Sequence, residues 1–171
     1  MATATLTTAE EYLAASYRPD RELLDGQLVE RNVGEYDHSN LQSRLTIWFG
    51  IRERQWGIRA LTEQRIRVAP HRFRIPDVCV IRRDQPVEPV FTRPPLICIE
   101  VLSREDTLRG LQERVTDYLT FGVPNVWVLD PSTRKAWVCD RSGFHEPQDE
   151  VLAAAGTEIA VPLRELFAEL D

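Results

Sequence analysis

The chain has almost no lysine, few cysteines and no long apolar run. Its single lysine among 171 residues is Lys135, so arginine carries nearly all of the positive charge. No apolar run approaches the roughly 20 residues that cross a bilayer, which argues against a membrane protein. The segment 1–8 holds no basic residue ahead of an apolar stretch, so no signal peptide is expected.

The three cysteines exclude a disulfide-rich scaffold. Cys79, Cys98 and Cys139 are odd in number, far apart and each set among apolar residues. That pattern fits neither paired cysteines nor the close spacing of a zinc motif. It is typical of buried, reduced thiols, and a cytoplasmic location is therefore expected.

The charge is unevenly distributed along the chain. Between Arg52 and Arg83 there are nine arginines and three carboxylates, so this segment carries +6, whereas the whole chain carries −6. Such asymmetry is typical of a local phosphate-facing surface on an acidic protein. A second interpretation, that arginine is simply the preferred cation of this chain, stays open.

The pattern of apolar and turn residues predicts one domain over residues 1–171 with a mixed α/β fold. Thr8 and Glu11 form a capping-box pattern that begins a helix, and Asp25-Gly26 predicts the turn of a β-hairpin. Further helices are expected over about 37–55, 106–121 and after Pro162, and strands over about 63–68, 76–81, 96–102, 126–129 and 135–139.

Two carboxylates stand in apolar strands. Glu100 lies within Leu-Ile-Cys-Ile-Glu-Val-Leu, and Asp77 precedes Val-Cys-Val-Ile. Burying an unpaired carboxylate costs several kcal/mol, and two on adjacent strands repel unless a cation lies between them. Mg²⁺ suits such a pair because it binds through one or two carboxylates and keeps several waters. The alternative is a buried salt bridge to an arginine.

The hypothesis that Asp77 and Glu100 share a metal also predicts how their two strands pair. Consecutive strands most often pair, and a hairpin makes them antiparallel. If Asp77 lies opposite Glu100, then Cys79 must lie opposite Cys98, because paired residues in an antiparallel ladder have a constant sum of numbers. The two cysteines are thus expected to be cross-strand neighbours beneath the site.

Several stretches in order carry a family resemblance. They are RELLDG at 21–26, His38 at the start of the long helix, IPDV at 75–78, IEVLS at 99–103 and GVPNVWVLDP at 122–131. The set resembles the PD-(D/E)XK nuclease superfamily. More closely, it is similar to the bacterial Uma-two family, whose members are described as putative restriction endonucleases.

The resemblance implies a restriction-endonuclease-like mixed sheet flanked by helices. It also implies hydrolysis of DNA phosphodiester bonds by a water that Mg²⁺ or Mn²⁺ activates. By the same resemblance Asp77, Glu100 and the backbone carbonyl of Val101 bind the metal, and the chain forms a homodimer. Glu22 matches an acidic position of the family, although a solvated hairpin glutamate is an equal alternative. His38 contacts a phosphate or caps the helix.

The chain departs from the superfamily where a catalytic lysine is expected. Leu102, two residues after Glu100, is apolar, and Arg114 stands where the Uma-two family has a lysine in the following helix. Arg114 lies at the border of the helix's apolar stripe and is expected to turn toward Glu100. Arginine can stabilise a phosphate charge but cannot act as a base. The alternative function is an inactive nuclease-like domain that acts in DNA binding or protein interaction.

Overall fold

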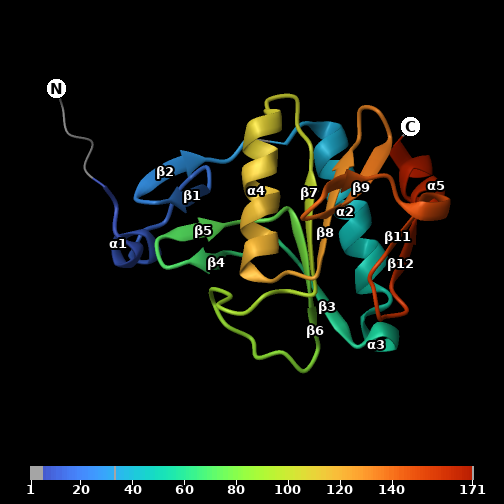
Figure 1. The fold of residues 1–171 in the computed structure, drawn as a ribbon, viewed down its shortest axis with the longest axis horizontal. Helices are drawn as coiled ribbons and strands as arrows, with labels where there is room; N and C mark the ends of the chain where they lie inside the picture. Colours follow the sequence, from blue (N-terminus) through green and yellow to red (C-terminus); the bar gives the residue numbers. More distant parts are fainter. Residues whose placement is uncertain (1–5, 33, 171) are drawn as a thin grey trace.

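The computed structural model describes residues 6–32 and 34–170, and Figure 1 shows how their elements are arranged. The helices are α1 (Ala9–Ala14), α2 (Tyr36–Gly50), α3 (Glu53–Trp56), α4 (Leu108–Phe121) and α5 (Leu163–Phe167), with short 3-10 turns at Gln148–Glu150 and Ala168–Leu170. The strands are β1 (Arg21–Leu24), β2 (Gln27–Glu30), β3 (Ile58–Thr62), β4 (Ile66–Ala69), β5 (Arg72–Arg74), β6 (Val78–Arg82), β7 (Ile97–Val101), β8 (Asn125–Asp130), β9 (Lys135–Asp140), β10 (Gly143–His145), β11 (Val151–Ala153) and β12 (Ala160–Pro162).

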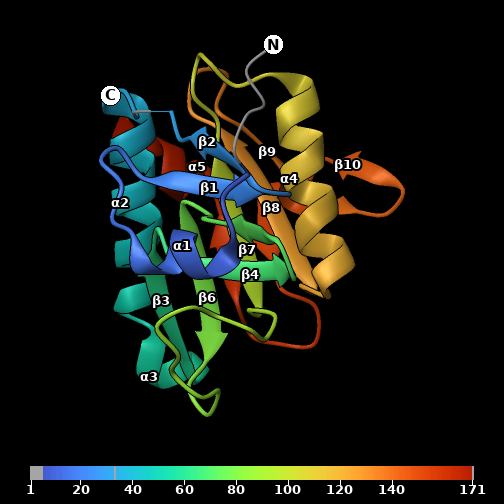
Figure 2. The same cartoon turned by 90° about the vertical axis from the view of Figure 1, so that its left-hand side faces the viewer.

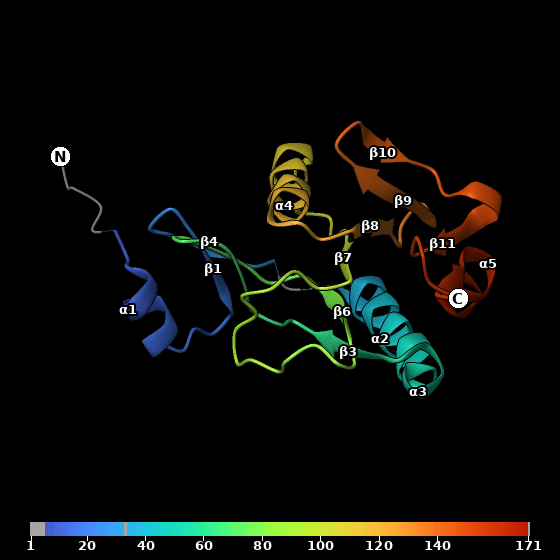
Figure 3. The same ribbon diagram turned by 60° about the horizontal axis from the view of Figure 1, so that its bottom comes forward.

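The largest sheet is mixed, as the sequence predicts. Its six strands have the order β10-β9-β8-β7-β6-β3. Only β7 and β8 run parallel, and α4 makes the crossover that a parallel pair requires. Figure 3 shows α4 on one side of this sheet and α2 on the other. The fold is therefore a mixed sheet flanked by helices.

Two apolar layers hold the helices on the sheet. Val78 and Val80 of β6 pack with Leu41 and Phe49 of α2. Cys79 and Ile81 of the same strand share a second layer with residues of α4. The alternation follows from the two-residue period of a strand, and it places Asp77 on the face that α4 covers.

The predicted register between β6 and β7 is confirmed. Cys79 pairs with Cys98, and Val78 pairs with Ile99 in an antiparallel ladder. Both cysteines are buried and free. Continuing the ladder by one step brings Asp77 opposite Glu100.

The α4 helix has clear start and stop signals. The Thr107 side chain accepts the N–H of Gly110 and caps the first turn. Gly122 ends the helix at φ 101°, a left-handed conformation that favours glycine. Leu111, Val115 and Tyr118 form its buried face. These signals lie in the sequence, and the predicted helix over 106–121 agrees with the observed one.

A second sheet, with strand order β2-β1-β5-β4, lies beside the large one. The predicted hairpin is present, with Leu24 opposite Gln27 and both Asp25 and Gly26 at positive φ, as a tight hairpin turn requires. Figure 2 shows β1 crossing between α2 on one side and α4 on the other. This small sheet therefore borders the face on which Asp77 and Glu100 lie.

Some expected elements are wrong. The single helix over 37–55 is divided, because α2 ends at Gly50 and α3 begins only at Glu53. The strand expected over 63–68 begins later, as β4, because Glu63 has φ 52°, which interrupts extended backbone, and β3 before it is not anticipated. The short strands β5, β10, β11 and β12 are not anticipated. Within the described residues, no helix combines the length and apolar character needed to cross a membrane.

Candidate metal and phosphate site

Asp77 is held against the end of β7. It lies in the short connection between β5 and β6 and is 4% exposed. Its Oδ2 accepts the backbone N–H of Val101 at 2.8 Å, and its Oδ1 accepts a bond from Arg31 Nη2 at 2.7 Å. The carboxylate is therefore fixed by the backbone on one oxygen and neutralised by a guanidinium on the other.

Glu100 is buried among groups from α4. Its Oε1 accepts the Tyr118 hydroxyl at 2.6 Å, and its Oε2 lies 3.1 Å from Arg114 Nε, an ion pair without hydrogen-bond alignment. Burial raises the pKa of Glu100 to about 7; Arg114 opposes this increase and the charge of Asp77 adds to it. The two carboxylates therefore interact, as the sequence argument expects.

Arg114 turns toward Glu100, which confirms the orientation predicted from its place on the helix. Its Nη2 also donates to Asp106 Oδ1 at 2.6 Å. Asp106 in turn accepts the N–H and hydroxyl of Ser103. Although burial opposes it, the pairing with Arg114 holds the pKa of Asp106 below its usual range. The sequence analysis did not identify Asp106 as a site residue. The Ser-x-x-Asp spacing after β7 is a capping pattern that could have indicated it.

Glu22 is a buried residue and not a solvated hairpin glutamate. It is 5% exposed, its Oε1 accepts the N–H of Ile75 at 2.9 Å, and its Oε2 pairs with Arg74 Nη1 at 2.6 Å. Arg74 continues to Asp117 of α4 at 2.6 Å. Glu22 thus joins the small sheet to the helix that carries Arg114.

His38 does not cap α2, so one of its two predicted roles is wrong. The N-cap residue is Glu35, and His38 instead places Nε2 3.4 Å from Asp77 Oδ2. Its Nδ1 is buried without a hydrogen-bond partner among the described residues. Burial lowers the pKa of His38, but the Asp77 carboxylate outweighs burial and raises it overall.

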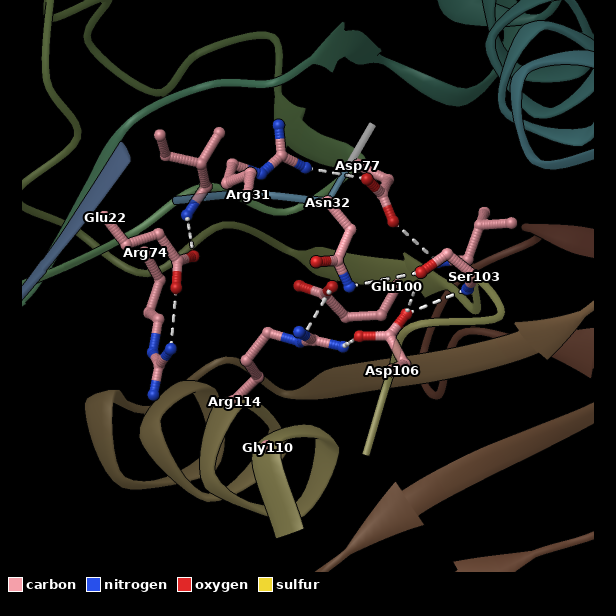
Figure 4. A network of polar contacts seen from close by, with 12 residues as sticks. Glu22, Arg31, Asn32, Arg74, Asp77, Glu100, Ser103, Asp106, Gly110 and Arg114 are labelled. Atoms are coloured by element: carbon pink, nitrogen blue, oxygen red, sulfur yellow. Dashed lines mark hydrogen bonds and ion pairs between the residues drawn. The ribbon is translucent and has the colours of Figure 1, made fainter. Parts of the chain in front are cut away.

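These side chains border one pocket of about 220 Å³. Figure 4 shows Asp77 and Glu100 approaching it from the large sheet, Arg114 from α4, and Arg31 and Asn32 from the segment that follows β2. The pocket is lined by every site residue predicted from the sequence: Glu22, His38, Asp77, Glu100, Val101 and Arg114. The other charged residues that line it are Glu30, Arg31, Arg74, Glu105, Asp106 and Glu113.

The donors at this pocket suit Mg²⁺ or Mn²⁺ in kind. Two buried carboxylates face one polar cavity, and such ions prefer oxygen ligands and keep waters. Among residues 6–32 and 34–170, no three His, Cys, Asp or Glu side chains are placed together to hold a metal. A cation would therefore depend on Asp77, Glu100, a backbone carbonyl and water, and it would share the carboxylates with Arg31 and Arg114.

Several arginines of the arginine-rich segment 52–83 form contacts within the molecule. Arg74 is 3% exposed, and Arg72 pairs with both Asp25 and Asp117. Arg65 lies over the ring of Tyr12 in α1, and Arg67 lies over the ring of Phe73 in β5. The local charge excess thus includes structural arginines as well as surface ones.

Comparison with known proteins identifies a family and solved structures of similar fold. The family model described as "Putative restriction endonuclease" (Uma2) matches residues 9–165. A crystal structure of a putative nuclease belonging to DUF820 from Anabaena variabilis is similar in fold, with a TM-score of 0.80 and 20% sequence identity. The similarity covers 96% of this chain and 99% of that one. No curated protein matches the chain.

Proposed function

The chain belongs to the Uma2 family of restriction endonuclease-like proteins, and from that premise we propose that it is a metal-dependent endonuclease that hydrolyses phosphodiester bonds in DNA. One observation carries the proposal most strongly. Two buried carboxylates, Glu100 on β7 and Asp77 directly before β6, face the same polar pocket, where the charge of Asp77 disfavours ionisation of Glu100. A bound cation relieves that cost.

Asp77, Glu100 and the carbonyl of Val101 are the proposed ligands of Mg²⁺ or Mn²⁺. When bound, the metal supplies an acidified water and offsets negative charge on the phosphate. Arg114 is the proposed catalytic cation: Asp106 fixes its guanidinium at the pocket, from which it contacts a phosphate oxygen. Glu22 orients the small-sheet wall through Arg74, and His38 lies beside Asp77 with its Nε2 3.4 Å from Oδ2.

A second candidate function is an inactive nuclease-like domain that acts in DNA binding or protein interaction. The observation that favours it is the pairing of both carboxylates with arginines, Arg31 on Asp77 and Arg114 on Glu100. In that arrangement each of the two carboxylates has a cationic partner without a divalent ion. The absence of a lysine at position 114 also favours an inactive domain.

The proposal extends to assembly and location. Cutting both strands of a duplex is simplest with two copies of the site, so we place the active form as a homodimer in the cytoplasm. Light scattering of the purified protein measures the mass directly, and a monomer at all concentrations would remove the homodimer from the proposal.

Plasmid nicking tests the activity. Wild type is compared with Asp77→Ala and with Asp84→Ala, which removes the same charge from an exposed loop residue outside the pocket. We expect nicking with Mg²⁺ or Mn²⁺, none with chelator, and loss only in Asp77→Ala. Equal nicking by wild type and Asp77→Ala would identify a contaminant and end the nuclease proposal.

A further inference from the structure

Arg31 forms an ion pair with Asp77, the carboxylate that the proposed function assigns to a metal. It follows directly after β2, in the segment that leads to α2, and its side chain is 17% exposed. Its Nη2 lies 2.7 Å from Asp77 Oδ1, whereas its Nη1 lies 3.6 Å from Glu63 Oε1. Arg31 therefore bridges a buried carboxylate and a half-exposed one.

Asp77 cannot easily serve a second cation in this arrangement. Its Oδ2 is engaged by the N–H of Val101, which fixes the plane of the carboxylate on β7, and His38 lies on the same oxygen. Oδ1 is the oxygen left for an incoming ion, and Arg31 holds it. Two positive charges on one oxygen repel each other.

The two arginines of the site differ in how they are tethered. Arg114 is tied to Asp106 by a 2.6 Å hydrogen bond and meets Glu100 only through a misaligned ion pair. Arg31 makes its short bond to the proposed metal ligand itself, and its other partner, Glu63, is 52% exposed at the edge of the site. A small movement of the Arg31 guanidinium toward Glu63 frees Asp77 and keeps one ion pair.

We propose that Arg31 is an internal competitor for the metal, which closes Asp77 when no ion is bound and moves to Glu63 when one enters. The inference rests on the proposed function, since it takes Asp77 as a metal ligand. Arg31 sets the metal affinity of the site by this competition and is not itself a ligand.

Calorimetric titration with Mn²⁺ tests the competition without measuring activity. Removing the charge in Arg31→Gln should tighten Mn²⁺ binding by about tenfold, because the competing cation is gone from 2.7 Å. Arg31→Lys keeps the charge and should bind no more tightly than wild type. Arg164→Gln is the matched control, since it removes the same charge from an exposed residue of α5 that does not line the pocket.

The outcomes separate the two proposals. Equal affinity in wild type and Arg31→Gln, with uptake abolished by Asp77→Asn, would overturn the role of Arg31 and leave the metal site standing. An equal gain in Arg164→Gln would also overturn it, as a general charge effect. If neither wild type nor Arg31→Gln binds Mn²⁺, the metal site of the proposed function fails as well.

A measurement on the unaltered protein keeps the test independent of how the variants fold. The guanidinium resonance of Arg31, followed by NMR in ¹⁵N-arginine-labelled wild type, should shift as Mg²⁺ is added and the Asp77 contact is lost. The Arg114 resonance should move less, because its bond to Asp106 persists. An Arg31 resonance that stays unchanged at saturating Mg²⁺ would contradict the proposal.

Discussion

Among single residues of the site, Glu100 has a charge state that depends strongly on its surroundings. Burial raises its pKa to about 7, while in the unfolded chain it ionises near an ordinary glutamate value. The folded state therefore holds a proton that the unfolded state releases, over the interval between those two values. The contribution of Glu100 to the free energy of unfolding is greatest below the pKa of the unfolded state. It is lost as pH rises through the pKa of the folded state.

This gives a pH prediction for the metal-free protein. Wild type should lose up to about 3 kcal/mol of unfolding free energy between about pH 5 and pH 8 through Glu100 alone. Glu100→Gln removes the titrating group and should show a flatter profile. Urea unfolding at several pH values measures both. Parallel profiles for the two proteins would show that Glu100 does not carry the dependence.

Substitutions that remove or keep the positive charge at position 114 test the proposed catalytic role of Arg114. Arg114→Gln should reduce nicking by about a hundredfold, the usual cost of losing one positioned donor to a phosphate charge. Arg114→Lys should keep most of the activity, because a cation remains beside Glu100. Arg109→Gln, on the same helix with its side chain 90% exposed, is the control and should leave nicking unchanged. Equal losses at positions 109 and 114 would contradict a specific role for Arg114.

Sequence reasoning at this scale succeeds where burial conflicts with charge. Asp77 and Glu100 stand out because a carboxylate in an apolar strand needs a partner, and Arg114 follows from helical spacing. Arg31 gives no such signal, because it is an ordinary cation after a hairpin. Its partner Asp77 lies 46 residues away and is brought to it only by the packing of the small sheet against the large one.

Among the elements, the β6–β7 hairpin has the register predicted from the sequence, in which Cys79 lies opposite Cys98. The same ladder buries Cys79 and Cys98 completely, and burial raises the pKa of Cys79 to about 12 and that of Cys98 well above its ordinary value. The thiolate is the reactive form of a cysteine, so both side chains are held in an inert state.

Thiol titration with Ellman's reagent checks this. At neutral pH the folded protein should show almost no reaction of its three cysteines, since Cys139 is buried as well. In denaturant all three should react at once. Fast reaction of any thiol in the folded protein would mean that the sheet opens locally, contrary to the packing described.

The small sheet is fastened to α4 by one buried ion network. Arg74 is 3% exposed and joins Glu22 to Asp117, whereas the side chain of Arg72 is 25% exposed and reaches Asp117 from the rim. Breaking a buried pair leaves an uncompensated charge, so Arg74→Met should cost about 3–5 kcal/mol of unfolding free energy. Arg72→Met is the control and should cost about 1 kcal/mol or less. Similar costs in urea unfolding would contradict the network's structural role.

Elements with strong local signals are predicted well and short ones are not. The capped helix α4, the Asp25-Gly26 turn and the apolar strand β7 each carry their own pattern. The three-residue strand β5 carries none: besides its neighbour β4 it pairs with β1, where Phe73 lies opposite Leu23 from a distant part of the chain. Such strands depend on tertiary contacts that no local pattern encodes.

Across the whole molecule, the site arises where two sheets and two helices converge. The large sheet supplies Glu100, the connection from the small sheet to β6 supplies Asp77, α4 supplies Arg114, and the segment between β2 and α2 supplies Arg31 (Figure 4). No single element contains the pocket, so metal binding is expected to stabilise the global fold and not one segment. A ligand that binds only the folded state raises its stability in proportion to the logarithm of its concentration.

That coupling gives a prediction in which pH and metal act together. Below a pH of about 7 Glu100 holds a proton, which a metal must displace, and above it the ionised pair binds the cation directly. Saturating Mn²⁺ should therefore raise the melting temperature more at pH 8 than at pH 6, by several degrees for about 1–2 kcal/mol of added stability. Glu100→Gln should lose most of the pH 8 gain, and Asp77→Asn should lose the gain at both pH values. Glu165→Gln, an exposed change on α5, should behave as wild type. A gain that is the same at both pH values, or that survives in Asp77→Asn, would place the bound metal elsewhere in the molecule.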